Sequence, residues 1–135
     1  MNESEIIQKF STSFIRRNSR ERTIYELKSP KKRMNFISKI GAMPDFFWSE
    51  KFEQVKKSEL FSFDKIPNDA KCYIISGFGD YDGLIITFKE AIENRNFGGS
   101  GTIIYDYNQN RLIYHEELSF GTPKVHYASD ENNKA

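Results

Sequence analysis

The thiol of Cys72 and the imidazoles of His115 and His126 are the only groups of their kinds in this sequence, and each can act as a nucleophile, a general base or a metal ligand. The 19 acidic residues could also supply an acid/base pair, but their spacing selects no particular pair. The two histidines lie in β-rich segments, so neighbouring strands would bring them together with Glu116 or Glu117 as an orienting carboxylate. The alternative is that each is a half-exposed strand histidine, which is the commoner outcome. Cys72 precedes an apolar run and is expected to be a small core side chain. We therefore assign no catalytic and no metal-binding residue.

Glycine and aspartate are concentrated in residues 77–83, one residue after the apolar run at residues 73–75. The glycines are similar to a nucleotide-binding loop, but their spacing differs from it and the aspartates would repel phosphate. A calcium loop is not matched either, because glycine comes too early. We expect an exposed turn in which Tyr81, flanked by Asp80 and Asp82, contacts a basic protein partner. The alternative is an ordinary turn, since these are also common turn-forming residues.

Basic residues are concentrated in the N-terminal third. The segment from Lys9 to Lys39 contains ten Lys and Arg but only Glu21 and Glu26 as acids, while the whole chain has a net charge of +1. On one common face these residues would bind phosphates or an acidic protein. Spread over several faces, they would pair with acidic residues elsewhere in the chain. The members of this candidate basic patch are Arg16, Arg17, Arg20, Arg22, Lys31, Lys32 and Arg33.

The composition fits one folded domain, which we place at residues 1–129. The chain has 135 residues, of which 38% are hydrophobic, and its 12 Phe and 7 Tyr can supply most of a core. Because Cys72 is the only cysteine, an internal disulfide and a cysteine-based zinc cluster are excluded. We expect no cofactor, and an enzyme is the least favoured class of function.

Two helices are predicted in the basic segment. Apolar residues recur at helical spacing from Glu3 to Arg17, so the first helix covers this range. The second begins at Ser29-Pro30, with Ser29 as N-cap, and stops at Gly41. Residues 23–27 between them read as a short strand or an extended connector. The apolar stripe of the second helix consists of Met34, Phe36, Ile37 and Ile40.

A third helix is predicted after Pro44, where Trp48, Phe52 and Val55 share one helical face. Residues 72–75 form a buried strand. A short helix then runs from Thr87 to Arg95. Thr87 is its N-cap, and Glu90 completes a capping box.

The last third of the chain is β-rich. Residues 102–107 and 111–114 form an antiparallel hairpin across a short connection, and residues 124–127 add an edge strand. The polar residues 130–135 form a frayed tail. Together these elements predict an α+β fold, in which N-terminal helices pack on a small, mostly antiparallel sheet that includes the C-terminal hairpin.

Neither an export signal nor a membrane span is expected. The first five residues are acidic rather than basic, and no apolar run approaches the roughly 20 residues that cross a bilayer. We therefore expect a cytoplasmic protein.

Three segments carry a resemblance to a known family: residues 14–27, residues 29–33, and residues 82–92 with their Asp82-Gly83 start. They look like a family of small uncharacterised bacterial single-domain proteins. The resemblance implies a bacterial setting and brings no active site. In general character such proteins are similar to immunity proteins. The leading hypothesis is a protein-binding module, of the kind that neutralises a bacterial toxin by direct binding. The alternative is a nucleic-acid-binding module that uses residues 16–33.

Overall fold

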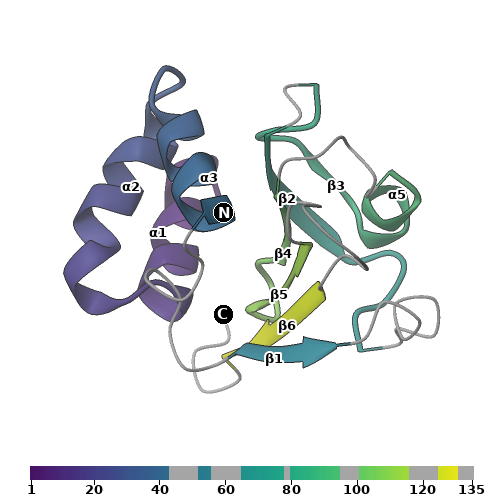
Figure 1. Cartoon of the computed structure of the whole chain (residues 1–135). Helices are drawn as coiled ribbons and strands as arrows, with labels where there is room; N and C mark the ends of the chain where they lie inside the picture. Colours follow the sequence, from purple (N-terminus) through teal and green to yellow (C-terminus); the bar gives the residue numbers. More distant parts are fainter. Residues whose placement is uncertain (43–51, 56–64, 78–79, 95–100, 116–124, 131–135) are drawn as a thin grey trace.

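The computed structural model describes residues 1–42, 52–55, 65–77, 80–94, 101–115 and 125–130. In these residues a six-stranded antiparallel sheet has the order β1-β6-β5-β4-β2-β3. Helices α1, α2 and α3 lie on one side of the sheet and α5 on the other (Figure 1). The α+β class is thereby confirmed. The elements are α1 (Glu3–Phe14), η1 (Arg17–Ser19), α2 (Arg20–Lys28), α3 (Arg33–Ala42), β1 (Phe52–Val55), β2 (Lys71–Ser76), β3 (Ile85–Thr87), α5 (Phe88–Glu93), β4 (Thr102–Asp106), β5 (Arg111–His115) and β6 (Val125–Ser129).

The first predicted helix is confirmed as α1. Its start is held by a capping box, in which the Asn2 side chain accepts from the backbone of Glu5 and the Glu5 side chain accepts from the backbone of Asn2. Its inner face is fully buried, and Phe10 packs edge-on against Tyr105 of the sheet with ring centroids 5.5 Å apart. The helix ends at Phe14 rather than Arg17, because Ile15 is already extended.

The strand or connector predicted at residues 23–27 is wrong, since these residues belong to α2. Thr23, Glu26 and Leu27 are all buried, which is the i, i+3, i+4 pattern of a helix face. Burial of this face outweighs the β propensity of Thr23, Ile24 and Tyr25.

Helix α3 confirms the second predicted helix but begins later than Ser29-Pro30. Residues 29–33 first form a turn, in which the Ser29 carbonyl accepts from the backbone of Lys32 at 2.9 Å and of Arg33 at 3.1 Å. Phe36 is buried as predicted, together with Ile37 and Ile40. Met34 is 48% exposed and is not part of the inner stripe.

Alternation along the strands gives the sheet two apolar faces. Tyr73, Tyr105 and Leu112 are paired across β2, β4 and β5 and belong to the core with α1–α3. Their neighbours Ile74 and Ile104 belong to a second core with α5. The predicted strand at residues 72–75 and the hairpin of β4 and β5 are thus confirmed.

The third predicted helix is wrong at residues 52–55, the part of it that the structure describes. Residues 52–55 are strand β1, which pairs with β6 in the register Phe52↔Ala128. Trp48 lies outside the described residues. Because β1 occupies the sheet edge, β6 is an inner strand and the edge position expected for residues 124–127 is wrong.

Helix α5 has the predicted N-cap. The Thr87 hydroxyl accepts from the backbone of Glu90 at 3.2 Å and donates to its carboxylate at 3.0 Å. The helix ends at Glu93, and Arg95 lies outside the described residues. No described helix is long and apolar enough to cross a membrane.

Asp130, which we assigned to the frayed tail, is bound in the fold. Its backbone N–H donates to the Asn110 carbonyl at 2.9 Å, and only 8% of the residue is exposed. Residues 131–135 lie outside the described part.

Candidate functional site

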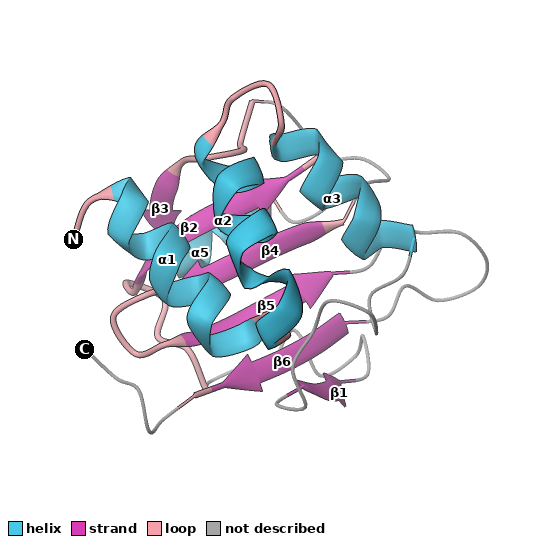
Figure 2. Ribbon diagram, turned by 90° about the vertical axis from the view of Figure 1, so that its left-hand side faces the viewer, coloured by secondary structure: helices cyan, strands magenta, loops and turns pink. Residues whose placement is uncertain are grey.

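The exposed basic residues lie along the outermost helix. Figures 1 and 2 both show α2 on the outside of the helical layer, with α1 and α3 beside it. Arg22, Tyr25 and Lys28 follow one another at intervals of three along α2 and are exposed, so they share its solvent face. The exposed residues of this region form what we call the basic surface: Arg16, Arg17, Arg22, Tyr25, Lys28, Lys31 and Lys32.

The charge of the basic surface is almost entirely positive. Six of its members are cationic, and Glu21 is the only exposed acidic residue between Arg16 and Lys32. At its middle, the ring of Tyr25 is 58% exposed and lies between Arg22 and Lys28 on the solvent face of α2. An exposed aromatic side chain among cations can supply apolar contact area within an electrostatically steered contact.

Other members of the predicted basic patch serve the fold instead. The Arg20 guanidinium donates to the Ile15 carbonyl at 2.8 Å, next to the end of α1. Arg33 is only 9% exposed. Outside the patch, Lys39 of α3 binds the buried carboxylate of Glu26 of α2 with contacts of 3.0 and 3.2 Å. The structure therefore divides the basic segment into the exposed residues of the basic surface and an inner set, Arg20, Arg33 and Lys39, that contacts other parts of the fold.

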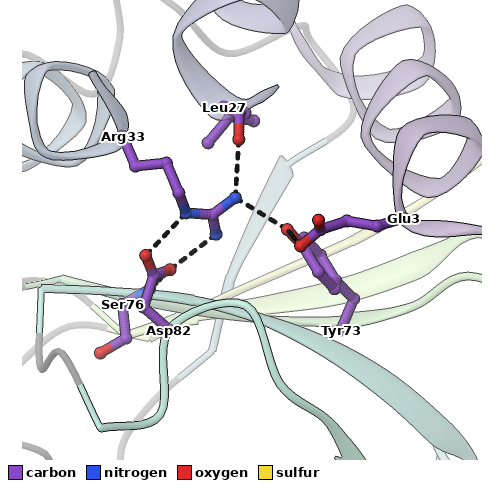
Figure 3. Close-up of polar contacts among 6 residues, drawn as sticks. All are labelled: Glu3, Leu27, Arg33, Tyr73, Ser76 and Asp82. Atoms are coloured by element: carbon purple, nitrogen blue, oxygen red, sulfur yellow. Dashed lines mark hydrogen bonds and ion pairs between the residues drawn. The ribbon is translucent and has the colours of Figure 1, made fainter. Parts of the chain in front are cut away.

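Arg33 is the centre of the inner set (Figure 3). Its Nε and Nη2 atoms donate to the two carboxylate oxygens of Asp82, both at 2.7 Å. Its Nη1 atom donates to the Leu27 carbonyl and to the Tyr73 hydroxyl, both at 2.8 Å. Burial alone disfavours the charge, but the contacts with Asp82 and Tyr73 outweigh it and raise the pKa of Arg33 above its ordinary value.

The partners of Arg33 are themselves held in place. The Tyr73 hydroxyl donates to Glu3 of α1 at 2.8 Å, and Asp82 accepts from the backbone of Ser76 at 3.1 Å. Gly83 follows with φ of +81°, a conformation that favours glycine. One buried guanidinium thereby joins α1, the end of α2, α3, strand β2 and the turn at residues 80–83 (Figure 3).

The acidic turn differs from our expectation of three residues facing a partner. Asp80 is exposed. The Asp82 side chain is 16% exposed and is engaged by Arg33. Tyr81 is partly buried against the α5 core, and its hydroxyl donates to Asn94 at 3.4 Å. Asp82 is therefore bound to Arg33 inside the fold, and Asp80 alone of these three residues is fully exposed to solvent.

The two histidines do not meet. His126 is paired with Tyr114, on which its ring stacks at 5.8 Å, whereas His115 is paired with Val125. Paired residues point to the same face and successive residues alternate, so His115 and His126 lie on opposite faces of the sheet.

The expected core position of Cys72 is confirmed. The thiol is buried and donates to the Ala70 carbonyl at 3.6 Å. Burial, with a smaller contribution from Asp106, raises the pKa of Cys72 above its ordinary value. A raised thiol pKa is the opposite of what a nucleophile requires. Within the described residues, no group of three or more His, Cys, Asp and Glu side chains could hold a metal ion.

Comparison with known proteins adds no assignment. A scan against protein-family models, a search of curated proteins and a search of solved structures each found no match.

Tyr25 was not among the predicted site residues, because residues 23–27 were expected to be a short strand or an extended connector rather than a helix. The signal was present in the spacing of Thr23, Glu26 and Leu27, which defines an inner helical face and leaves Tyr25 on the opposite side. Met34 was missed for a different reason. It lies within α3, but the 3.6-residue period turns it away from the face that Phe36, Ile37 and Ile40 share, so it is exposed.

Proposed function

We propose that this chain is a binding protein that recognises an acidic protein surface through the basic surface. The observation that carries the proposal is the 58% exposed ring of Tyr25 at the centre of exposed cations on the outermost helix. Tyr and Arg, together with Trp, are enriched among interface hot spots, while surrounding charges accelerate encounter and select the partner.

A protein is favoured over a nucleic acid as the partner. Glu21 lies one turn from Tyr25 on α2 and would repel a phosphate backbone, whereas a protein surface of mixed charge can accommodate it. The loss of Arg20 and Arg33 to internal contacts also shortens the row of cations available to phosphates. Nucleic-acid binding is therefore the second candidate, supported by the remaining exposed cations.

The immunity-protein role is the narrower form of this proposal. It is supported by the resemblance to small bacterial proteins and by an exposed charged surface suited to rapid association. The sequence suggested that the acidic turn contacts a basic partner, but Asp82 of this turn is paired with Arg33. We therefore propose that the basic surface makes the contact and that the toxin presents an acidic surface. A cytoplasmic location accompanies this role and is supported by the single, buried, reduced thiol of Cys72.

Site-specific photocrosslinking tests the proposal. A photoreactive phenylalanine analogue replaces Tyr25 in the full chain, expressed in its native cells, and the same analogue replaces exposed Lys89 of α5 as the matched control. We expect a protein adduct from position 25 and none from position 89. A variant with Lys28, Lys31 and Lys32 all changed to Glu should abolish the adduct.

Three other outcomes would overturn it. A nucleic-acid adduct at position 25 would replace the proposal with the second candidate. An adduct of equal yield at position 89 would show contact without preference for the basic surface. Absence of any adduct at position 25, with the protein folded and present at normal level, would remove this surface as a binding site.

A further inference from the structure

The turn between α2 and α3 carries the densest charge of the basic surface. Lys28, Lys31 and Lys32 are all exposed within five consecutive positions, and no acidic residue lies among them. Like charges this close repel one another, so a free chain segment would spread and move. A partner that binds such a segment must first order it, which weakens binding.

Arg33 holds this turn at both of its ends. At the end of α2, its Nη1 atom bonds the Leu27 carbonyl at 2.8 Å. At the start of α3, its backbone N–H closes the turn onto the Ser29 carbonyl at 3.1 Å. One residue thus ties the chain on either side of all three lysines.

The other side of the same guanidinium is anchored to the sheet. Asp82 receives two hydrogen bonds of 2.7 Å from Arg33 and one of 3.1 Å from the backbone of Ser76 at the end of β2. Both ionic partners are largely buried, with side chains 11% and 16% exposed. A lysine could not replace this arrangement, because its single ammonium cannot form the planar two-pronged contact and reach Leu27 as well.

We propose that Arg33, through Asp82, is a positioning residue for the basic surface: it fixes the α2–α3 turn against the sheet so that Lys28, Lys31 and Lys32 are presented in one preformed arrangement to an acidic protein segment. The proposal rests on the proposed function. It adds that affinity depends on a residue that does not itself touch the partner. It also gives the acidic turn at residues 80–83 a role on the inner side of the same surface.

The test compares Arg33→Lys, which retains the charge, with the wild-type full chain. Two quantities are measured: amide hydrogen exchange at Lys32 and Arg33, and affinity for poly-L-glutamate, a probe of carboxylate-rich protein segments. We expect exchange to accelerate at least tenfold, and affinity to fall about tenfold, because the turn must now be ordered on binding. Asp82→Asn should give the same two changes with a smaller amplitude, since the neutral amide still accepts one bond.

Ile113→Val is the matched control for a general loss of stability. It removes one methylene group from the α5 core, on the other side of the sheet from the turn. We expect it to lower thermal stability while leaving turn exchange and poly-L-glutamate affinity within twofold of wild type. Equal effects of Ile113→Val and Arg33→Lys would overturn the positioning role, and so would wild-type affinity in Arg33→Lys.

The two proposals can fail separately. The exchange measurement needs no ligand, so an unprotected turn in the wild type overturns the positioning role whatever the probe does. Failure of the wild type to bind poly-L-glutamate, with a protected turn, counts against the acidic-protein partner. Binding of double-stranded DNA but not of poly-L-glutamate would assign the preformed turn to phosphates and overturn the partner class named here.

Discussion

At the scale of single residues, Asn110 shows how a polar side chain can organise a core. It is fully buried in the hairpin turn and adopts φ of +53°, which few residues other than glycine tolerate. Its side-chain oxygen accepts from the Tyr105 hydroxyl, and its amide donates to Ser13 of α1 at 2.8 Å. Its carbonyl accepts from the backbone of Asp130. One residue therefore links the hairpin, the first helix and the end of β6.

Replacement of Asn110 by Ala should lower the free energy of unfolding by about 3 kcal/mol, because it strains the backbone and leaves buried polar partners unpaired. Asn110→Gly relieves the backbone strain and should be less harmful by about 1 kcal/mol. Urea denaturation measures both. Asn108→Ala, at an exposed position of the same turn, is the control and should change stability by less than about 0.5 kcal/mol. A loss at position 108 as large as that at 110 would contradict the assigned role.

At the scale of elements, an ion pair joins α2 to α3, and only its carboxylate partner, Glu26, is fully buried. The Glu26 side chain is 2% exposed, whereas Lys39 is 34% exposed and Arg22, the second cation near Glu26, is 67% exposed. Arg22 lies at 3.5 Å, so Lys39 at 3.0 Å is the main partner of the buried carboxylate. The two halves of the pair should therefore respond differently to mutation.

Lys39→Met should cost about 2 kcal/mol, because it leaves a buried carboxylate with one weak partner. Glu26→Gln should cost only about 1 kcal/mol, since the released ammonium of Lys39 reaches water and the amide keeps some hydrogen bonds. Chemical denaturation of the two single variants and the double variant gives the costs and their coupling. Equal costs for the two single variants would show that Glu26 is better hydrated than its burial indicates.

At the scale of the whole molecule, the sheet buries the weakly acidic side chains of Cys72, Tyr73 and Tyr105. Burial raises the pKa of Cys72 above its ordinary 9.0, and that of Tyr73 and Tyr105 above 10.0. The unfolded chain ionises these groups at lower pH than the folded protein does. The stability that they contribute is therefore complete below pH 9 and is lost as the pH rises above it.

We accordingly expect the contribution of these groups to the free energy of unfolding, measured by urea denaturation, to be constant between pH 7 and 8. Above pH 9 it should fall by up to about 1.4 kcal/mol per pH unit for each group that ionises only in the unfolded chain. Cys72→Ala should remove the part of the fall between pH 9 and 10, where the thiol of the unfolded chain ionises before the tyrosines. Wild-type stability that rises over this range, or a Cys72→Ala profile parallel to wild type, would contradict this account.

Sequence patterns of short range determined much of the fold. Residues only a few positions apart determine the apolar period of α1, the N-cap at Thr87 and the hairpin of β4 and β5. These features can therefore be predicted without knowledge of the rest of the chain. The burial of Cys72 was predicted for the same reason, because it directly precedes an apolar run. Of the candidate site, the sequence predicted only the concentration of positive charge in residues 9–39.

Tertiary structure decided what local patterns left open. Residues 23–27 form a helix because the core accepts their i, i+3, i+4 face, and residues 52–55 form a strand because β6 lies beside them. Within Lys31-Lys32-Arg33, only Arg33 turns inward, because its carboxylate partner Asp82 is 49 positions away in the chain and is brought to it by the sheet. Residue type sets the charge of a side chain locally. Whether that charge faces a partner or the core depends on contacts distant in sequence, which the folded chain alone establishes.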